Sequence, residues 1–165
     1  MHGDLLGLAS ELIARRGASR LSWQRFGPAY VQDETPFLEA TTVRGDAVRA
    51  LYLLCGATDL SAETGRSDLF AAARAQWDDL VAGKAYLTGG VGSRHRDEAF
   101  GERYELPSDH AYCGTCASIA SVMWNWRMLL ATGDRCLVDL VLLGPPASGS
   151  CDKFQAAAPR RAPTT

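Results

Sequence analysis

The chain has 165 residues, of which 47% are apolar and 22% charged, a balance typical of one globular domain. Its formal net charge of −2 gives no indication of a nucleic-acid or membrane-surface partner. No apolar run approaches the ~20 residues that span a bilayer, and the N-terminus lacks a signal-peptide pattern. The five cysteines favour reduced thiols and a cytoplasmic location over a disulfide framework. We interpret Cys55 and Cys136 as small buried apolar residues.

Apolar residues recur at helical spacing and predict five helices. The apolar positions of the first four are Leu5, Leu8, Ala9, Leu12 and Ile13; Ala47, Val48, Leu51, Tyr52 and Cys55; Leu69, Phe70, Ala73, Trp77, Leu80 and Val81; and Ile119, Val122, Met123, Trp126, Leu129 and Leu130. The residues expected at the helix ends are Gly17, Gly56, Gly83 and Gly133 as caps and Ser67 as the N-cap of the third helix. A short fifth helix is expected from Asp134 to about residue 143.

Two long connections, residues 18–42 and 84–111, contain the glycines and prolines of irregular loops. Short strands have some support only at Val43 and around Leu87, because no alternating pattern is sustained. We therefore predict an all-α domain over residues 1–143 with long functional loops at one end. Residues 144–165 have the composition of a disordered tail.

Residues of the second connection are the candidates for chemistry. Glu98 follows a glycine-rich loop and fits a general acid or base, although its charged neighbours equally fit a solvated cluster. Cys113 and Cys116 form a C-x-x-C pair at an expected helix start, where the helix dipole favours thiolates. The pair fits a dithiol redox site, a zinc site with His110 that lacks a fourth ligand, or two half-buried cysteines.

Two tryptophans of the fourth helix are candidates for packing. Trp126 is expected in the core, and Trp124 is expected to reach a neighbouring helix. Stacking of either indole on a sugar is the alternative interpretation.

Several of these segments resemble glycoside hydrolase family 127, the β-L-arabinofuranosidase group. The matching segments are Phe26-Gly-Pro-Ala-Tyr30, Gln32-Asp33, Gly45-Asp-Ala-Val-Arg-Ala-Leu-Tyr52, Tyr86-Leu-Thr-Gly-Gly-Val-Gly-Ser93, Glu98-Ala-Phe100, Tyr104-Glu-Leu-Pro107 and Thr115-Cys-Ala-Ser118. Their order and spacing agree from about residue 5 to residue 140. The resemblance implies part of an (α/α)6 barrel and retaining hydrolysis of terminal β-L-arabinofuranosides. It also implies a cysteine nucleophile on a zinc held by one glutamate and three cysteines, with a separate glutamate as acid.

The resemblance assigns the acid/base role to Glu98 and a zinc-ligand role to Cys116. Gly114 replaces the glutamate ligand, and Asp46 occupies the substrate-binding position of a family histidine. The family's nucleophilic cysteine lies further downstream, and Cys151 comes too early for that role. We therefore expect an interrupted gene product that does not hold zinc stably.

The sequence thus predicts about five helices of a twelve-helix barrel, marginally stable and with little or no glycosidase activity alone. The expected partners are an arabinofuranoside-type carbohydrate and either a second copy or a separately encoded remainder of the barrel. The alternatives are a non-catalytic binding or assembly piece and, less favoured, a thiol redox module.

Overall fold

The computed structural model describes residues 2–21, 25–134 and 137. Its α-helices are α1 His2–Ala14, α2 Ala47–Thr64, α3 Ser67–Gly83 and α4 Thr115–Thr132, and its 3-10 turns are η1 Pro28–Val31, η2 Phe37–Glu39 and η3 Arg96–Glu98. The described residues form isolated bridges at Asp46–Ala99 and Ala85–Val91 but no strand. The all-α prediction is confirmed. The predicted fifth helix, except Asp134 and Leu137, and the tail lie outside the described residues.

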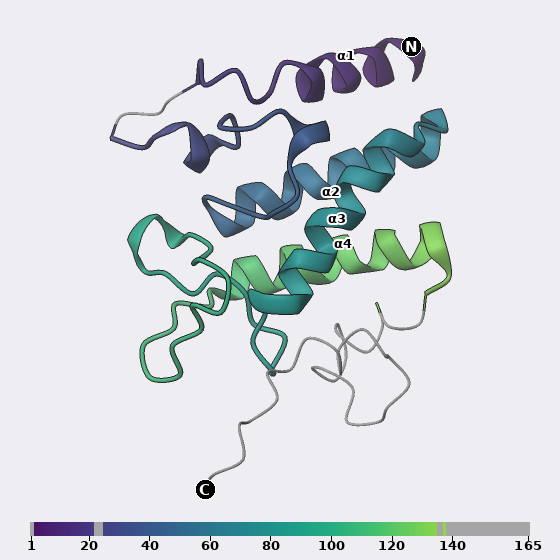
Figure 1. Cartoon of the computed structure of the whole chain (residues 1–165). Coiled ribbons are helices and arrows are strands. Elements are labelled where there is room, and N and C mark those ends of the chain that lie inside the picture. Colours follow the sequence, from purple (N-terminus) through teal and green to yellow (C-terminus); the bar gives the residue numbers. More distant parts are fainter. Residues whose placement is uncertain (1, 22–24, 135–136, 138–165) are drawn as a thin grey trace, which may run out of the picture.

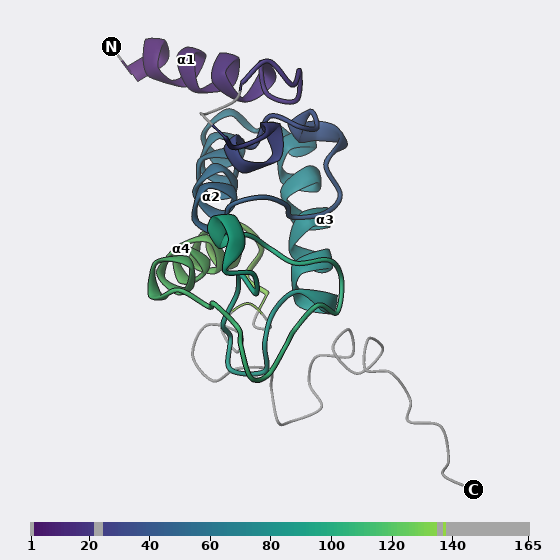
Figure 2. The same ribbon diagram turned by 90° about the vertical axis from the view of Figure 1, so that its left-hand side faces the viewer.

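Helix α2 is the centre of the packing, since it contacts α1, α3 and α4. Helices α2 and α4 begin at the same end of the molecule, and the loops of residues 84–114 gather there (Figure 1). In the perpendicular view these loops cover that end, while α1 lies at the far edge, across α2 (Figure 2). Two helix N-termini and one long loop therefore meet in one place. Across the described ranges, no helix is long and apolar enough to cross a membrane.

The core is built between α2, α3 and α4, and two buried tryptophans join them. Trp77 of α3 donates its indole N–H to Asn125 of α4 at 2.7 Å. Trp124 of α4 donates to the hydroxyl of Thr58 on α2 at 3.3 Å, and that hydroxyl donates to the Leu54 carbonyl. Each indole therefore buries its apolar body without leaving its N–H group unpaired.

The first long connection is organised by a buried aspartate, Asp33. Its carboxylate accepts the backbone N–H groups of Gly17, Arg20 and Leu21 at 2.7–2.8 Å. Burial acts to raise the pKa of Asp33, but these N–H donors outweigh it, so the pKa lies below its ordinary value. The segment after α1 is thereby folded back onto residues 28–44.

Most helix ends differ from their predicted caps. Helix α1 ends at Ala14, before Gly17, and α3 includes Gly83 and is capped by Lys84. Helix α2 continues through Gly56 and ends at Gly65, whose φ of +69° gives the left-handed cap. The prediction failed because Ala57 and Leu60 extend the buried face, and tertiary packing outweighs the low helix propensity of one glycine. Ser67 is the first residue of α3 rather than its N-cap, which is Arg66. The cap of α4 at Gly133 is as predicted.

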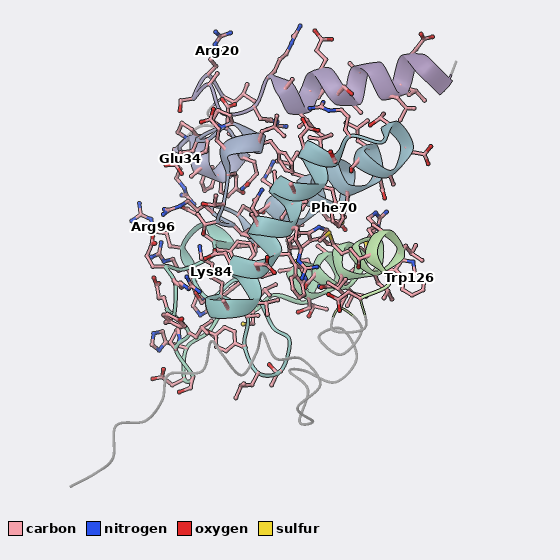
Figure 3. The ribbon with its side chains drawn as sticks, turned by 45° about the vertical axis from the view of Figure 1, so that its right-hand side comes forward. Arg20, Glu34, Phe70, Lys84, Arg96 and Trp126 are labelled. Atoms are coloured by element: carbon pink, nitrogen blue, oxygen red, sulfur yellow. The ribbon has the colours of Figure 1, made fainter. Side chains whose placement is uncertain are left out.

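The predicted core stripe of α4 is wrong at Ile119, Val122, Trp126 and Leu130, which are exposed, whereas Met123 and Leu129 pack against the core. Trp124 is fully buried, whereas Trp126 is 56% exposed and points away from the other helices (Figure 3). The buried positions of α4 are Ala117, Ala120, Ser121, Trp124, Asn125 and Met128. The helix carries apolar residues on both faces, and the face with small and polar residues is the one that approaches α2 and α3. In α1, similarly, Ile13 is buried while Leu5, Leu8 and Leu12 are exposed.

Candidate functional site

The first side chain of the candidate site is held by the start of α2. Asp46 is the N-cap of that helix and accepts the Arg49 backbone N–H at 2.8 Å. Its side chain is buried, with 5% of the residue exposed. Burial raises the pKa of Asp46; the Arg49 N–H and guanidinium oppose this rise, and the Glu98 charge adds to it. The Asp46 carboxyl group is therefore fixed in place close to Glu98.

The loop that carries Glu98 is tied to the start of α2. The Phe100 N–H donates to the Gly45 carbonyl at 2.9 Å, and Ala99 bridges to Asp46. Within η3, Asp97 and Glu98 have positive φ angles of 59° and 48°. Such strain in non-glycine residues persists only where surrounding contacts fix it, and it is concentrated at functional sites. Glu98 itself is exposed, so it is accessible from outside.

Gly92 allows the glycine-rich loop to lie directly on α2. Its φ is +80°, and a Cβ at this position would lie 3.0 Å from the Cβ of Ala47. The loop then presents two carbonyl groups to the next segment. Ser93 accepts the Tyr112 N–H at 3.2 Å, and Gly92 accepts the Cys113 N–H at 2.9 Å. These contacts place the start of α4 beside the Glu98 loop.

Tyr112 joins the predicted residues into one site. Its pKa is raised, chiefly because its hydroxyl can donate a hydrogen bond to the Glu98 carboxylate; burial and the nearby Cys116 and Asp46 groups add to the rise. The His95 ring contacts the Tyr112 ring edge-on, with centroids 5.3 Å apart. The structure therefore brings together Asp46, Glu98 and Cys116, the three predicted site residues with functional side chains.

Sequence reasoning did not select Tyr112 as a site residue. A signal was present, because the tyrosine directly precedes the C-x-x-C pair and so lies at the entrance of a helix. The contact with Glu98, however, depends on how two loops cross, and spacing along the chain does not give that information.

The cysteine pair does not have the geometry of a dithiol site. Cys113 precedes the N-cap Gly114 and has a φ of +42°, so it lies outside α4. Burial raises the pKa of the Cys113 thiol, which contradicts the predicted low value. Cys113 is half-buried, Cys116 is exposed, and both thiols are free. Cys55 is buried as predicted, and its pKa is raised to about 11.

The described residues do not fit a zinc site. Within them, no three His, Cys, Asp or Glu side chains lie close enough together to hold a metal, and so the predicted group of His110, Cys113 and Cys116 is not formed. Gly114 contributes no side chain. A Cβ at that position would lie 3.0 Å from Cε1 of Tyr112 and 3.3 Å from the sulfur of Cys116. The tyrosine ring thus fills the space beside position 114.

Comparisons with known proteins identify the family to which the chain is similar. Residues 2–141 match the model of the β-L-arabinofuranosidase GH127 catalytic domain. A non-reducing end β-L-arabinofuranosidase of Bifidobacterium longum subsp. longum is 36% identical over 104 residues, which are 63% of this chain and 16% of that protein.

Solved structures show the same relationship. A GH127 β-arabinofuranosidase is 39% identical with a TM-score of 0.77, over 82% of this chain and 21% of that one. A GH127 β-L-arabinofuranosidase from Geobacillus stearothermophilus T6 is 34% identical with a TM-score of 0.77, over 82% of this chain and 24% of that one. The chain thus spans about a fifth of the length of these relatives. It belongs to the GH127 β-L-arabinofuranosidase family, and the part that matches lies in the catalytic domain.

Proposed function

We propose that this chain forms the acid–base side of a β-L-arabinofuranosidase site, with Glu98 as the group that protonates the glycosidic oxygen. The observation that carries the proposal is the convergence of Asp46, Glu98, Tyr112 and Cys116 at the shared end of α2 and α4. The B. longum relative, named for hydrolysis of non-reducing end β-L-arabinofuranosides, supports the substrate class.

The three polar side chains have different tasks in this proposal. Glu98 is exposed, so a terminal sugar can approach its carboxyl group. In this proposal Tyr112 is a positioning residue, whose hydroxyl can donate a hydrogen bond to that carboxyl group. Asp46 accepts hydrogen bonds from sugar hydroxyl groups when ionised and can donate one when protonated. Its raised pKa makes the protonated form more accessible than in an exposed aspartate.

The described residues supply only the proposed acid–base group of this reaction. They form no metal-binding group, and Gly114 offers no side chain at the position of the family's glutamate. The purified 165-residue chain is therefore expected to release no arabinose from an aryl β-L-arabinofuranoside above the no-enzyme rate. Turnover that Glu98→Gln abolishes would overturn this expectation of inactivity.

A chimera tests the role of Glu98 directly. Residues 2–141, which match the family model, would replace the corresponding part of the B. longum relative and would carry Gly114→Glu, whose Cβ requires the Tyr112 ring to move by a few tenths of an ångström. We expect aryl arabinofuranoside hydrolysis, with a loss of about 10²–10⁴-fold in kcat on Glu98→Gln, the range typical of a general acid. The matched control is Glu102→Gln, an exposed glutamate of the same loop. An equal loss in both variants, or no loss on Glu98→Gln, would contradict the assignment.

A second candidate function is assembly, either with a second copy of this chain or with a polypeptide that supplies further barrel helices. It is favoured by two apolar surfaces: Leu5, Leu8 and Leu12 on α1, and Ile119, Val122, Trp126 and Leu130 on α4. Surfaces of this kind mark interaction sites. Light scattering across a range of concentrations would detect self-association, and Trp126→Glu is expected to reduce it. A monodisperse monomer at all concentrations would argue against self-association.

A further inference from the structure

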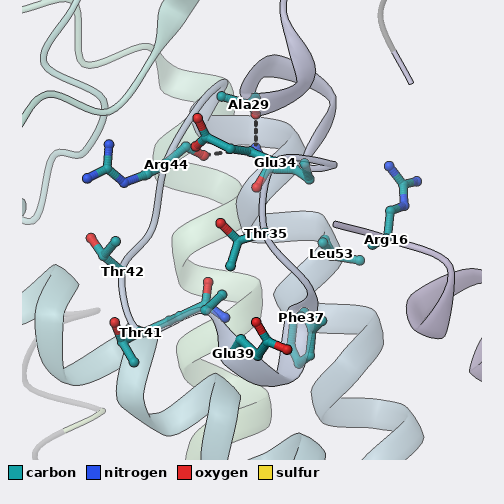
Figure 4. A pocket seen from close by; sticks show the side chains of 13 residues that line it. Arg16, Ala29, Glu34, Thr35, Phe37, Glu39, Thr41, Thr42, Arg44 and Leu53 are labelled. Atoms are coloured by element: carbon teal, nitrogen blue, oxygen red, sulfur yellow. Dashed lines mark hydrogen bonds between the residues drawn. The ribbon is translucent and has the colours of Figure 1, made fainter. Parts of the chain in front are cut away.

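A cavity lies away from the candidate site, between residues 28–44 and the helices α2 and α3. Its volume is about 160 Å³. Figure 4 shows it surrounded by side chains of Glu34, Thr35, Glu39, Thr41 and Thr42, with Phe37 and Leu53 as apolar walls. None of the residues that line it is Asp46, Glu98, Tyr112 or Cys116. The cavity is therefore a separate feature of the fold.

Gln76 gives this cavity an unpaired donor. The residue lies on α3, lines the cavity and is only 6% exposed. Its side-chain Nε2 is buried and has no hydrogen-bond partner among the described residues. Buried polar groups are normally paired, and an unpaired one is unfavourable. An occupant with an acceptor oxygen would satisfy this amide.

The rest of the lining indicates what kind of occupant fits. Glu34 and Glu39 are balanced in formal charge by Arg16 and Arg44, so neither an anion nor a cation is favoured. Thr35 and Thr41 are exposed residues with hydroxyl groups at the rim, where they can donate and accept. Amides, carboxylates and hydroxyls around an apolar wall match a ligand that both donates and accepts hydrogen bonds.

Hydrogen bonds hold the wall of the cavity in place. Gln32 donates its side-chain amide to the carbonyls of Ala29 and Arg44, at 3.1 and 2.8 Å (Figure 4). Thr42 donates to Asp79 of α3 at 2.5 Å, which ties the loop to the helix that carries Gln76. The cavity is thus bounded by residues whose positions are fixed by hydrogen bonds, as expected for a largely pre-formed site.

We propose that this cavity is a second, non-catalytic binding site for a neutral polyhydroxylated ligand of monosaccharide size, with Gln76 as its central hydrogen-bond donor. The volume lies below the ~300–1,000 Å³ of drug-sized pockets, which suits a single sugar ring. The site is independent of Glu98 and of the proposed hydrolysis.

Saturation-transfer NMR of L-arabinose with the full chain tests the proposal, and backbone amide shifts locate the bound sugar. We expect transfer at millimolar sugar, with shifts concentrated in residues 34–42. Gln76→Leu, which keeps the volume but removes the amide, is expected to weaken binding about tenfold. Glu98→Gln is the matched control and is expected to leave these shifts unchanged, which separates this site from the proposed catalytic one.

The proposal would be overturned by no transfer at the highest soluble sugar concentration, by shifts confined to residues 92–116, or by unchanged affinity in Gln76→Leu. Binding of inorganic phosphate in preference to L-arabinose would also overturn it, because the lining would then select charge. If circular dichroism shows that Gln76→Leu is unfolded, Thr35→Val at the exposed rim is the test variant instead. A loss of sugar affinity of about threefold is expected for it. Unchanged affinity in Thr35→Val would count against the site.

Discussion

The guanidinium group of Arg94 binds the carboxylate of Glu105 with two hydrogen bonds, from Nε to Oε1 at 2.6 Å and from Nη2 to Oε2 at 2.5 Å. The same carboxylate accepts the Glu102 N–H at 2.9 Å. The Arg94 hydrogen bonds, with that of the Glu102 N–H, lower the pKa of Glu105 to about 2. Residues 94 and 105 flank the segment that carries Glu98, so this pair closes the loop of the candidate site.

This pair predicts a loss of stability in acid. The folded-state pKa of Glu105 lies below its ordinary value of 4.5, so its contribution is full above pH 4.5 and is lost as the pH falls through about 2. In urea unfolding, the decrease in stability over this range should be smaller in Glu105→Gln than in the natural chain. Glu63→Gln, at an exposed position of α2, is the control. Parallel pH curves for the natural chain and Glu105→Gln would contradict the prediction.

The two tryptophans of α4 should respond oppositely to truncation. Trp124→Ala removes a fully buried indole that bonds to Thr58, and a loss of about 3–5 kcal/mol of unfolding free energy is expected. Trp126→Ala removes an exposed indole, and a change within about 0.5 kcal/mol is expected. Chemical denaturation of both variants measures the difference. A larger loss at Trp126 would mean that the other face of α4 is the buried one.

The two tryptophans of α4 also show which part of the fold the sequence does not predict. The period of apolar residues located the four described helices, and the glycines at 83 and 133 marked two of their ends within a residue. In α4, however, Ile119, Val122, Trp126 and Leu130 form a more hydrophobic stripe than the face that is buried. Because both faces of α4 carry apolar residues, the sequence does not show which face packs against α2 and α3.

For the site, the resemblance selected Asp46, Glu98 and Cys116, which the structure brings together at the start of α2 and α4. It could not supply Tyr112, because the contact with Glu98 depends on the crossing of two loops. Nor could it show that Cys113 lies outside the helix, since one left-handed residue before Gly114 changes its environment. The spacing of residues along the chain predicts neither long-range contacts nor the backbone conformation of a single residue.

The contribution of Asp46 to the free energy of unfolding should decline as the pH rises. Because its folded-state pKa is raised above the ordinary 3.8, the folded protein holds this proton more tightly than the unfolded chain. Its contribution is most favourable below pH 3.8 and declines as the pH rises through the raised value. Asp46→Asn keeps an N-cap acceptor and should remove this decline, whereas Asp46→Ala also loses the cap, at about 0.5–2 kcal/mol. Identical pH profiles for Asp46→Asn and the natural chain would contradict the raised pKa.

The three described cysteines should differ in alkylation. Cys116 is exposed and should react first with iodoacetamide. Cys113 is half-buried, with its sulfur 3.3 Å from where a Cβ of Gly90 would lie, and its raised pKa reduces the thiolate fraction, so it should react several-fold more slowly. Cys55 is buried, with a pKa of about 11, and should react only after unfolding. Peptide mass spectrometry over time gives the order at each site.

The same experiment separates the candidate site from a redox module. A dithiol centre requires a reactive, low-pKa thiol in the C-x-x-C pair and a disulfide that forms and breaks reversibly. Because Cys113 precedes the helix and its pKa is raised, Cys116→Ser is expected to leave the slow reaction of Cys113 unchanged. A Cys113 that reacts faster than Cys116, with a reversible disulfide between them, would favour the redox function over the glycosidase site.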